Sequence, residues 1–157
     1  MIGYEKLKPN TFIFDLDGTL CDANGRNYYT PTDKEILADL PIKSVINVLN
    51  SLYMDNYQII FVSGREDKYF RATIIWLMNN TNLSTDVKIF MRKTGDKRPD
   101  NEIKTEIYNN FIKDNYNVLG VFDDREKVIK AWKELGLFVD RKSTRLNSSH
   151  TVISYAV

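Results

Sequence analysis

Cysteine and histidine are almost absent from this sequence of 157 residues, which contains one of each, Cys21 and His150. A single cysteine excludes an intrachain disulfide and a cysteine-rich zinc site. A single histidine close to the end of the sequence excludes Ser-His-Asp hydrolysis and phosphoryl transfer through histidine, because both need an imidazole at the centre of the fold. If the protein is an enzyme, carboxylates, lysines, arginines or a bound metal must carry its chemistry.

Long apolar runs are also missing. No stretch approaches the roughly 20 apolar residues that span a bilayer, and residues 1–8 are charged and lack the apolar core of a secretory signal. Hydrophobic residues make up 43% and charged residues 27%, as in ordinary globular proteins. The net charge is +1, but Arg141, Lys142 and Arg145 lie at the end of the sequence, and without them 19 basic against 21 acidic residues give −2. A body of that charge gives no global support for nucleic-acid binding. We expect one domain with no membrane association, in a reducing, cytoplasmic setting.

Acidic residues are missing from the end of the sequence, residues 141–157. This segment shows no sustained periodicity, and it resembles the translation of a short-read sequencing adapter. We therefore expect a domain over residues 1–140, truncated just as its last strand begins, followed by a tail that is not native.

Short runs of β-branched and aromatic residues alternate with segments of helical periodicity. Strands are expected at residues 11–14, 58–62, 87–91, 118–122 and from 137, and helices from Pro41, over 67–80, from Asp100 to about 114 and up to Leu135. Asp100 is expected to cap its helix, whose inward face would carry Ile103, Ile107, Phe111 and Ile112. This alternation predicts an α/β fold whose parallel sheet is covered by helices on both faces. The carboxyl ends of its strands lie along one edge, where ligands bind.

Two aspartates, Asp15 and Asp17, follow the first expected strand, and Gly18 then turns the chain. Residues i and i+2 of a strand point the same way, so the two carboxylates are crowded. Like charges at this spacing are costly unless a cation or a proton joins them. A hard divalent cation bound by oxygen atoms is the expected partner, with Mg²⁺ favoured.

The run Asp15-Leu16-Asp17-Gly18-Thr19-Leu20 resembles the haloacid dehalogenase (HAD) superfamily of phosphatases and phosphotransferases. The resemblance continues in order through Ser63-Gly64-Arg65, Lys104 and Asp123-Asp124. It implies a three-layer, Rossmann-like HAD fold. The insert between Leu20 and Pro41 has about 20 residues, too few for an independent cap domain, so we expect a minimal cap and an open site.

The resemblance implies roles for these residues. Asp15 would attack phosphorus as the nucleophile, and Asp17 would protonate the leaving oxygen and later deprotonate water. Lys104 would neutralise both the nucleophile and the phosphate. Ser63 and the amide of Gly64 would donate hydrogen bonds to phosphoryl oxygens.

The resemblance also implies a Mg²⁺ site. Its ligands would be Asp15, the backbone carbonyl of Asp17, and Asp123. Asp124 would either bind the metal through water or anchor neighbouring donors.

A narrower resemblance is to the 3′-phosphatase domain of phage-type polynucleotide kinases. Its further matches are Asn24-Gly25-Arg26, Val62-Ser63-Gly64-Arg65, Gly95-Asp96-x-Arg98, Asp100-x-x-x-Lys104, Asp123-Asp124-Arg125, and Trp132 with Gly136. It implies that Arg26 and Arg65 line the phosphate pocket, where a guanidinium can fork onto two phosphate oxygens. Asp100 would position Lys104 or an arginine through a salt bridge.

The expected function is Mg²⁺-dependent removal of 3′-phosphate from the ends of DNA or RNA through an aspartyl-phosphate. The sequence contains no Gly-x-x-x-x-Gly-Lys-[Ser/Thr] loop, so we expect no kinase activity from it. Two alternatives stay open: a HAD phosphatase for a small-molecule phosphate such as a nucleotide, and a non-catalytic module that binds phosphorylated ends. The sequence does not indicate an oligomeric state.

Overall fold

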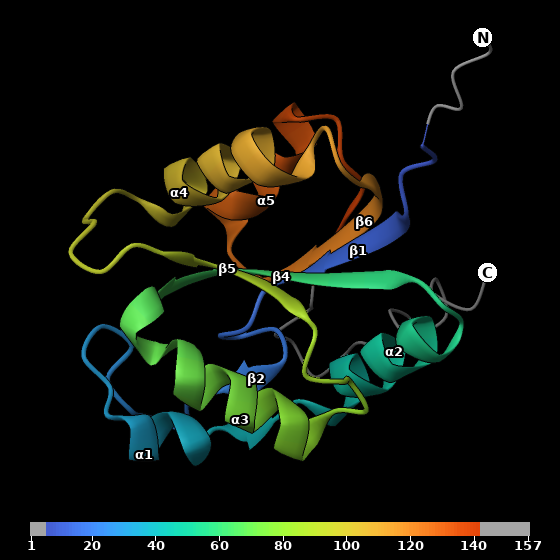
Figure 1. The fold of residues 1–157 in the computed structure, drawn as a ribbon. Helices are drawn as coiled ribbons and strands as arrows, with labels where there is room; N and C mark the ends of the chain where they lie inside the picture. The colour runs from blue at the N-terminus through green and yellow to red at the C-terminus, as the bar shows by residue number, and fades with distance from the viewer. Residues whose placement is uncertain (1–5, 142–157) are drawn as a thin grey trace, which may run out of the picture.

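A five-stranded sheet forms the centre of the computed structural model, which describes residues 6–141 (Figure 1). Its strands lie in the order β5 (Lys88–Arg92), β4 (Gln58–Glu66), β1 (Asn10–Phe14), β6 (Asn117–Asp123) and β7 (Val139–Arg141). The pairings within this sheet are all parallel. The first strand of the chain is therefore central, and the carboxyl ends of β4 and β6 lie on either side of its own.

Helices cover both faces of the sheet (Figure 1). On one side lie α2 (Lys43–Met54) and α3 (Phe70–Asn80), and on the other α4 (Asp100–Ile107) and α5 (Glu126–Glu134). Successive residues of β1 point to opposite faces, so Phe14 joins one apolar cluster with Leu49, and Ile13 joins the other with Trp132. Burial on both faces is typical of a parallel sheet. The predicted three-layer α/β fold is confirmed.

The segment between β1 and α2 forms a minimal cap. It contains β2 (Cys21–Asp22) and β3 (Leu40–Pro41), which pair antiparallel, and the short helix α1 (Asp33–Leu37). Thr32 and Glu35 close the start of α1 with a reciprocal capping box. The prediction that Pro41 opens a helix is wrong: Pro41 pairs with Cys21 in this ribbon, and α2 begins at Lys43.

Strand β4 is longer than predicted. The strand was expected to end at Val62, before Ser63-Gly64-Arg65, but it continues to Glu66. After a register shift beyond Ser63, Glu66 pairs with Arg92 of β5. The guanidinium of Arg92 also donates to the carbonyl of Gly64 at 2.8 Å. Pairing with a neighbouring strand outweighs the local preference of glycine for a turn.

The helix expected to run from Asp100 to about 114 is interrupted. Helix α4 ends at Ile107, and a π-helical turn, η2 (Tyr108–Ile112), follows it. The prediction that Phe111 faces the core is wrong, since its side chain is 53% exposed and its ring stacks on Phe90. A π-turn inserts an extra residue into the helix and so rotates the residues that follow.

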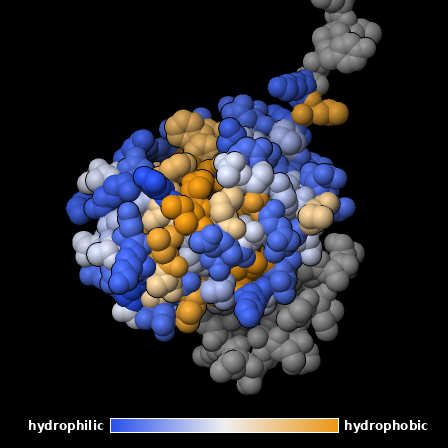
Figure 2. Space-filling view, turned by 60° about the horizontal axis from the view of Figure 1, so that its bottom comes forward, coloured by the Kyte–Doolittle hydropathy of each residue, from blue (hydrophilic) through white to orange (hydrophobic). Residues whose placement is uncertain are grey.

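The face that carries α1 and α3 shows an apolar strip among hydrophilic side chains (Figure 2). Leu37 of α1 and Ile75 of α3 are among the large apolar residues that stay exposed. None of the described helices is long and apolar enough to cross a membrane.

The predicted tail, residues 141–157, overlaps the described residues only at Arg141. Arg141 ends strand β7, so the folded domain reaches one residue beyond the predicted boundary at 140. Residues 142–157, the remainder of the predicted adapter-derived tail, lie outside the described residues.

A three-residue 3₁₀ turn, η1 (Asp67–Tyr69), leads from β4 into α3.

Candidate active site

Charged side chains from three elements meet at the carboxyl edge of the sheet. Asp15 directly follows β1, and its backbone N–H donates to the carbonyl of Phe122 at 2.9 Å, which ties the end of β1 to β6. Asp123 is the last residue of β6. Lys104 reaches the same point from α4. The strand order brings these groups together as the sequence predicted.

Lys104 is the centre of this cluster. Its ammonium lies 2.8 Å from Asp15 Oδ1 and 2.8 Å from Asp123 Oδ2, and its side chain is only 2% exposed. Burial opposes its charge, but Asp123 and Asp15 outweigh burial and raise the pKa of Lys104 above its usual value. The indole N–H of Trp132 donates to Asp123 Oδ2 at 3.2 Å and helps to orient that carboxylate.

Asp15 is poised between two opposing effects. Burial raises the pKa of Asp15 well above its usual value, the charge of Lys104 lowers it, and the charge of Asp123 raises it further. The hydroxyl of Thr19 donates to Asp15 Oδ2 at 3.3 Å. An additional cation would favour the ionised form of Asp15.

Asp124 completes a group with the donor chemistry of a Mg²⁺ site. One carboxylate oxygen from each of Asp15, Asp123 and Asp124 lies within 4.8 Å of the others. Asp124 Oδ1 is buried and has no hydrogen-bond partner among the described residues. Three carboxylates and the single ammonium of Lys104 leave a formal charge of −2. These residues fit a divalent cation with oxygen ligands.

Asp17 belongs to a second network of charged side chains, separate from the Lys104 cluster, in which it binds Arg65 and Arg26. Arg65 donates to both of its carboxylate oxygens, from Nη2 at 2.7 Å and from Nε at 3.1 Å, and Arg26 Nη2 donates to Oδ1 at 2.9 Å. Burial alone would raise the pKa of Asp17, but Arg65 and Arg26 outweigh burial and lower it. Asp17 is therefore a carboxylate in the free protein.

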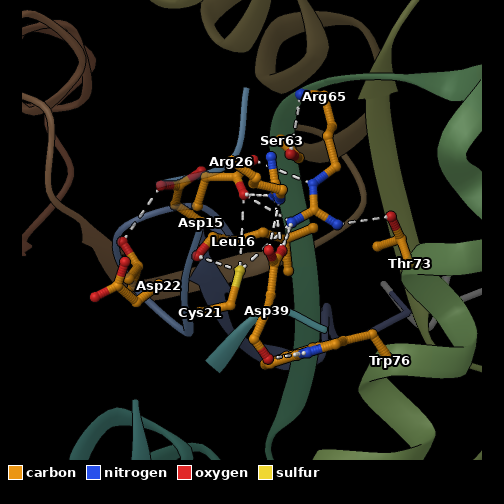
Figure 3. Close-up of polar contacts among 12 residues, drawn as sticks. Asp15, Leu16, Cys21, Asp22, Arg26, Asp39, Ser63, Arg65, Thr73 and Trp76 are labelled. Carbon is orange, nitrogen blue, oxygen red and sulfur yellow. Dashed lines mark hydrogen bonds and ion pairs between the residues drawn. The ribbon is translucent and has the colours of Figure 1, made fainter. Parts of the chain in front are cut away.

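Asp39 holds both arginines, and sequence analysis missed it. Its side chain is buried and accepts from Arg26 Nε at 2.5 Å, from Arg26 Nη2 at 2.7 Å and from Arg65 Nη2 at 3.1 Å (Figure 3). The indole N–H of Trp76 fixes the backbone carbonyl of Asp39 at 2.9 Å. No motif surrounds Asp39 in the sequence, so only the folded structure identifies it.

The two arginines predicted to line the phosphate pocket are bonded to carboxylates, and Arg65 also lines the cleft described below. Arg26 and Arg65 were predicted to fork onto phosphate, but in the structure their guanidinium groups bond to Asp17 and Asp39. Asp17, Asp39 and Cys21 also lie close enough to hold a cation. The arginines already supply the positive charge there, and burial raises the pKa of the Cys21 thiol well above its usual value.

Gly64 and Asp100 form the opposite side of the site. A side chain at Gly64 would place its Cβ 2.5 Å from Asp100 Oδ1 and would have to displace that carboxylate. The prediction that Asp100 caps α4 is wrong: the cap residue is Pro99, and the Asp100 carboxylate instead bridges Arg92 and Arg125. The expected salt bridge of Asp100 is thus made to arginines and not to Lys104.

A cleft of about 790 Å³ opens above these groups. Of the predicted site residues, it is lined by Asp15, Asp17, Gly64, Arg65 and Asp100. The sequence did not identify Arg92 and Arg125 as the partners of Asp100, and both also line the cleft. The Ser63 hydroxyl oxygen is buried and accepts from the Arg65 amide at 3.1 Å. The other predicted site residues are not among the described residues that line the cleft: Arg26, Ser63, Lys104, Asp123 and Asp124.

A doubly covered parallel sheet, with aspartates after its central strands and a lysine from a neighbouring helix, defines a HAD-type phosphatase domain. Residues 9–141 match the sequence profile of the polynucleotide kinase PNKP phosphatase domain. The chain belongs to this family.

Related proteins agree with this assignment. A candidate bifunctional polynucleotide kinase/RNA ligase of Autographa californica nuclear polyhedrosis virus is 32% identical over 130 residues, which cover 81% of this chain and 18% of the relative. A chain of the Pnkp1/Rnl/Hen1 RNA repair complex is 35% identical, with a TM-score of 0.79 over 86% of this chain and 42% of that one. This chain thus spans less than half the length of either protein.

More distant structures share the fold alone. A D,D-heptose 1,7-bisphosphate phosphatase from B. bronchiseptica, complexed with magnesium and phosphate, is 13% identical, with a TM-score of 0.58 over 83% of this chain and 78% of that one. A class C acid phosphatase from Bacillus anthracis is 16% identical, with a TM-score of 0.58 over 86% and 68% of the two chains.

Gly18→Ala tests the cation site. Gly18 has a φ of +82°, and a Cβ there would lie 2.1 Å from Asp124 Oδ2, so alanine must displace that carboxylate. We expect Mg²⁺ affinity, measured from the rise of melting temperature with MgCl₂, to fall about 10–100-fold. Gly136→Ala is the matched control, because Gly136 has the same φ and its Cβ would meet nothing within 4 Å. Equal losses of affinity in both variants would contradict the assignment.

Asp39→Asn tests the arginine network. The change removes one of the two carboxylates that compensate the buried Arg26 and Arg65, so we expect the free energy of unfolding to fall by about 3–5 kcal/mol in urea titrations. Asp55→Asn, at an exposed position that ends α2, should change it by less than about 0.5 kcal/mol. If the two variants unfold at the same urea concentration, Asp39 does not hold the network.

Proposed function

We propose that this domain removes the terminal phosphate from 3′-phosphorylated nucleic-acid ends, with Mg²⁺ and through an aspartyl-phosphate on Asp15. The observation that carries the proposal is the buried bridge from Lys104 to Asp15 and Asp123, beside Asp124. A surface lysine would be an ordinary helix residue. A lysine that is fully buried between two carboxylates at a cleft costs desolvation energy, which a catalytic role explains.

Asp15 forms the new bond. One of its carboxylate oxygens attacks phosphorus while the bond between phosphorus and the 3′ oxygen breaks, and water later releases the phosphate from Asp15. A protonated carboxyl would be a poor nucleophile, and burial favours that form. The ammonium of Lys104, 2.8 Å away, opposes this effect and also offsets the repulsion between Asp15 and an incoming phosphate.

Asp17 moves the proton. The leaving 3′ oxygen needs a proton in the first step, and the attacking water must lose one in the second. Arg65 and Arg26 keep Asp17 ionised in the free protein, which suits the second step. The negative charge of a bound phosphate would raise the pKa of Asp17 and so favour the protonated form that the first step requires. Because Arg65 bonds both oxygens of Asp17, the carboxylate is held in one orientation.

Mg²⁺ would be held by Asp15, Asp123 and Asp124. When bound, it would supply positive charge against the phosphoryl oxygens. Asp123 is prepared for this role, since Trp132 and Lys104 fix its Oδ2, and the amides of Asp124 and Arg125 fix its Oδ1 at 2.9 and 3.3 Å. Arg125 and Arg92 line the cleft and would meet the outer oxygens of the phosphate.

The choice of a polymer end rests on the open cleft and on family membership. The cap consists of one short helix and a two-stranded ribbon, so it leaves an opening through which a chain can enter. The family is that of polynucleotide kinase phosphatase domains, and one similar structure is described as an RNA repair complex. A nucleic-acid 3′-phosphate is a phosphate monoester that fits both the open cleft and the family.

The test is release of inorganic phosphate from a 3′-phosphorylated oligonucleotide. We expect release in MgCl₂, none in EDTA, and a loss of at least about 10³-fold in Asp15→Asn, because the amide cannot form the covalent intermediate. Asp22→Asn, an exposed aspartate in the same region of the chain, should retain full activity. Melting curves of both variants would confirm that they are folded. Hydrolysis of mononucleotides or sugar phosphates without release from oligonucleotides would refute the proposed substrate.

A further inference from the structure

Two tyrosines line one wall of the cleft and have no role in the chemistry described above. Tyr28 and Tyr29 follow Arg26 in the cap and are 47% and 86% exposed. Large aromatic side chains this exposed bury little of their apolar surface, so they add little to folding stability. Two adjacent rings at the mouth of a phosphate site are therefore better explained by a ligand than by the core.

Contacts within the cap hold the ring of Tyr28 and the backbone of Tyr29. The side chain of Asn27 accepts from the amides of Tyr29 at 2.8 Å and Thr30 at 3.2 Å, which closes a tight turn. The guanidinium of Arg26 lies 5.6 Å from the centre of the Tyr28 ring, within cation–π range. Arg26 is itself anchored to Asp17 and Asp39. The ring of Tyr28 and the backbone of Tyr29 are thus anchored beside Asp17 and Asp39.

Basic side chains stand elsewhere around the same cleft. Lys97, from the loop after β5, and Lys127, at the start of α5, are both exposed and line it. Lys68 and Arg98 also line it, but they form ion pairs with Glu66 and with Asp96 and Glu106. Lys97 and Lys127 are therefore best placed to meet phosphodiester groups.

We propose that Tyr28 and Tyr29 form a stacking platform for the base at an unpaired 3′ end, while Lys97 and Lys127 contact the backbone leading to it. The proposal rests on the proposed function and specifies its substrate as single-stranded. Every base has a π-face, so aromatic stacking binds single strands with little preference for sequence. In a duplex the terminal base is paired and stacked on its neighbour, and cannot lie on the tyrosines without first being released.

The first test compares substrates and variants. We expect Tyr29→Ala to lower kcat/KM about tenfold on a single-stranded 3′-phosphorylated oligonucleotide, mainly through KM. Tyr29→Phe keeps the ring and should retain activity. Phe138→Ala is the matched control, since Phe138 is 71% exposed and is not among the described residues that line the cleft. On β-glycerophosphate, a phosphate monoester with no ring that could stack on a tyrosine, all three variants should match the wild type.

An abasic 3′-terminal nucleotide shows whether the ring acts on the base. Wild type should process this substrate about as slowly as Tyr29→Ala processes the intact one, and Tyr29→Ala should lose nothing further on it. In the same assay, Lys97→Gln and Lys127→Gln should reduce the dependence of KM on salt, whereas Lys130→Gln, exposed and outside the cleft lining, should not.

Several results would overturn the platform while leaving the phosphatase proposal intact. One is full activity of Tyr29→Ala on oligonucleotides, and another is an equal loss on the intact and abasic substrates. A third is equal turnover of blunt duplex and single-stranded ends by the wild type. If the wild type hydrolyses β-glycerophosphate but no oligonucleotide, the nucleic-acid substrate itself is refuted, and the platform with it.

Discussion

The rest of the site depends on one interaction, the bridge that Lys104 makes between Asp15 and Asp123. Parallel pairing of β1 with β6 forces these carboxylates together at the end of the sheet, with Asp124 beside them. Their mutual repulsion and their burial would otherwise favour protonated, unreactive forms. The lysine reduces this cost and leaves a charge that one divalent cation would neutralise. Fold and chemistry are thus coupled through a single ammonium group.

Next to this cluster, a set of buried ion pairs holds Asp17 in one orientation. Asp39 and Asp17 share two arginines, and every bond in the network fixes the direction of Asp17. Buried ion pairs of this kind add little net stability, because desolvation of the charges cancels much of their attraction. Under the proposed mechanism their benefit is geometric: Asp17, the proposed proton-transfer group, must stay in one place while the charge in front of it changes.

The sequence predicted the features that depend on residues close together in the chain. The apolar strand before Asp15 and the aspartates at 15, 17, 123 and 124 were identified from short patterns at strand ends, and Lys104 from the family resemblance. The fold then brings Asp15, Lys104 and Asp123 together. Features that depend on distant partners were missed. The role of Asp39 depends on its contacts with Arg26 and Arg65. The Asp100 carboxylate binds Arg92 and Arg125 instead of capping its helix. Strand β4 continues past Val62 because β5 lies next to it.

The central position of β1 also has a consequence for the order of folding. This strand is made first, yet both of its sheet partners are made later, and the Lys104–Asp15 bond closes a loop of 89 residues. Non-local pairing of this kind slows folding. While β4 and β6 are still being synthesised, the apolar strand Asn10–Phe14 has neither neighbour, and so it stays open to aggregation until both have been made.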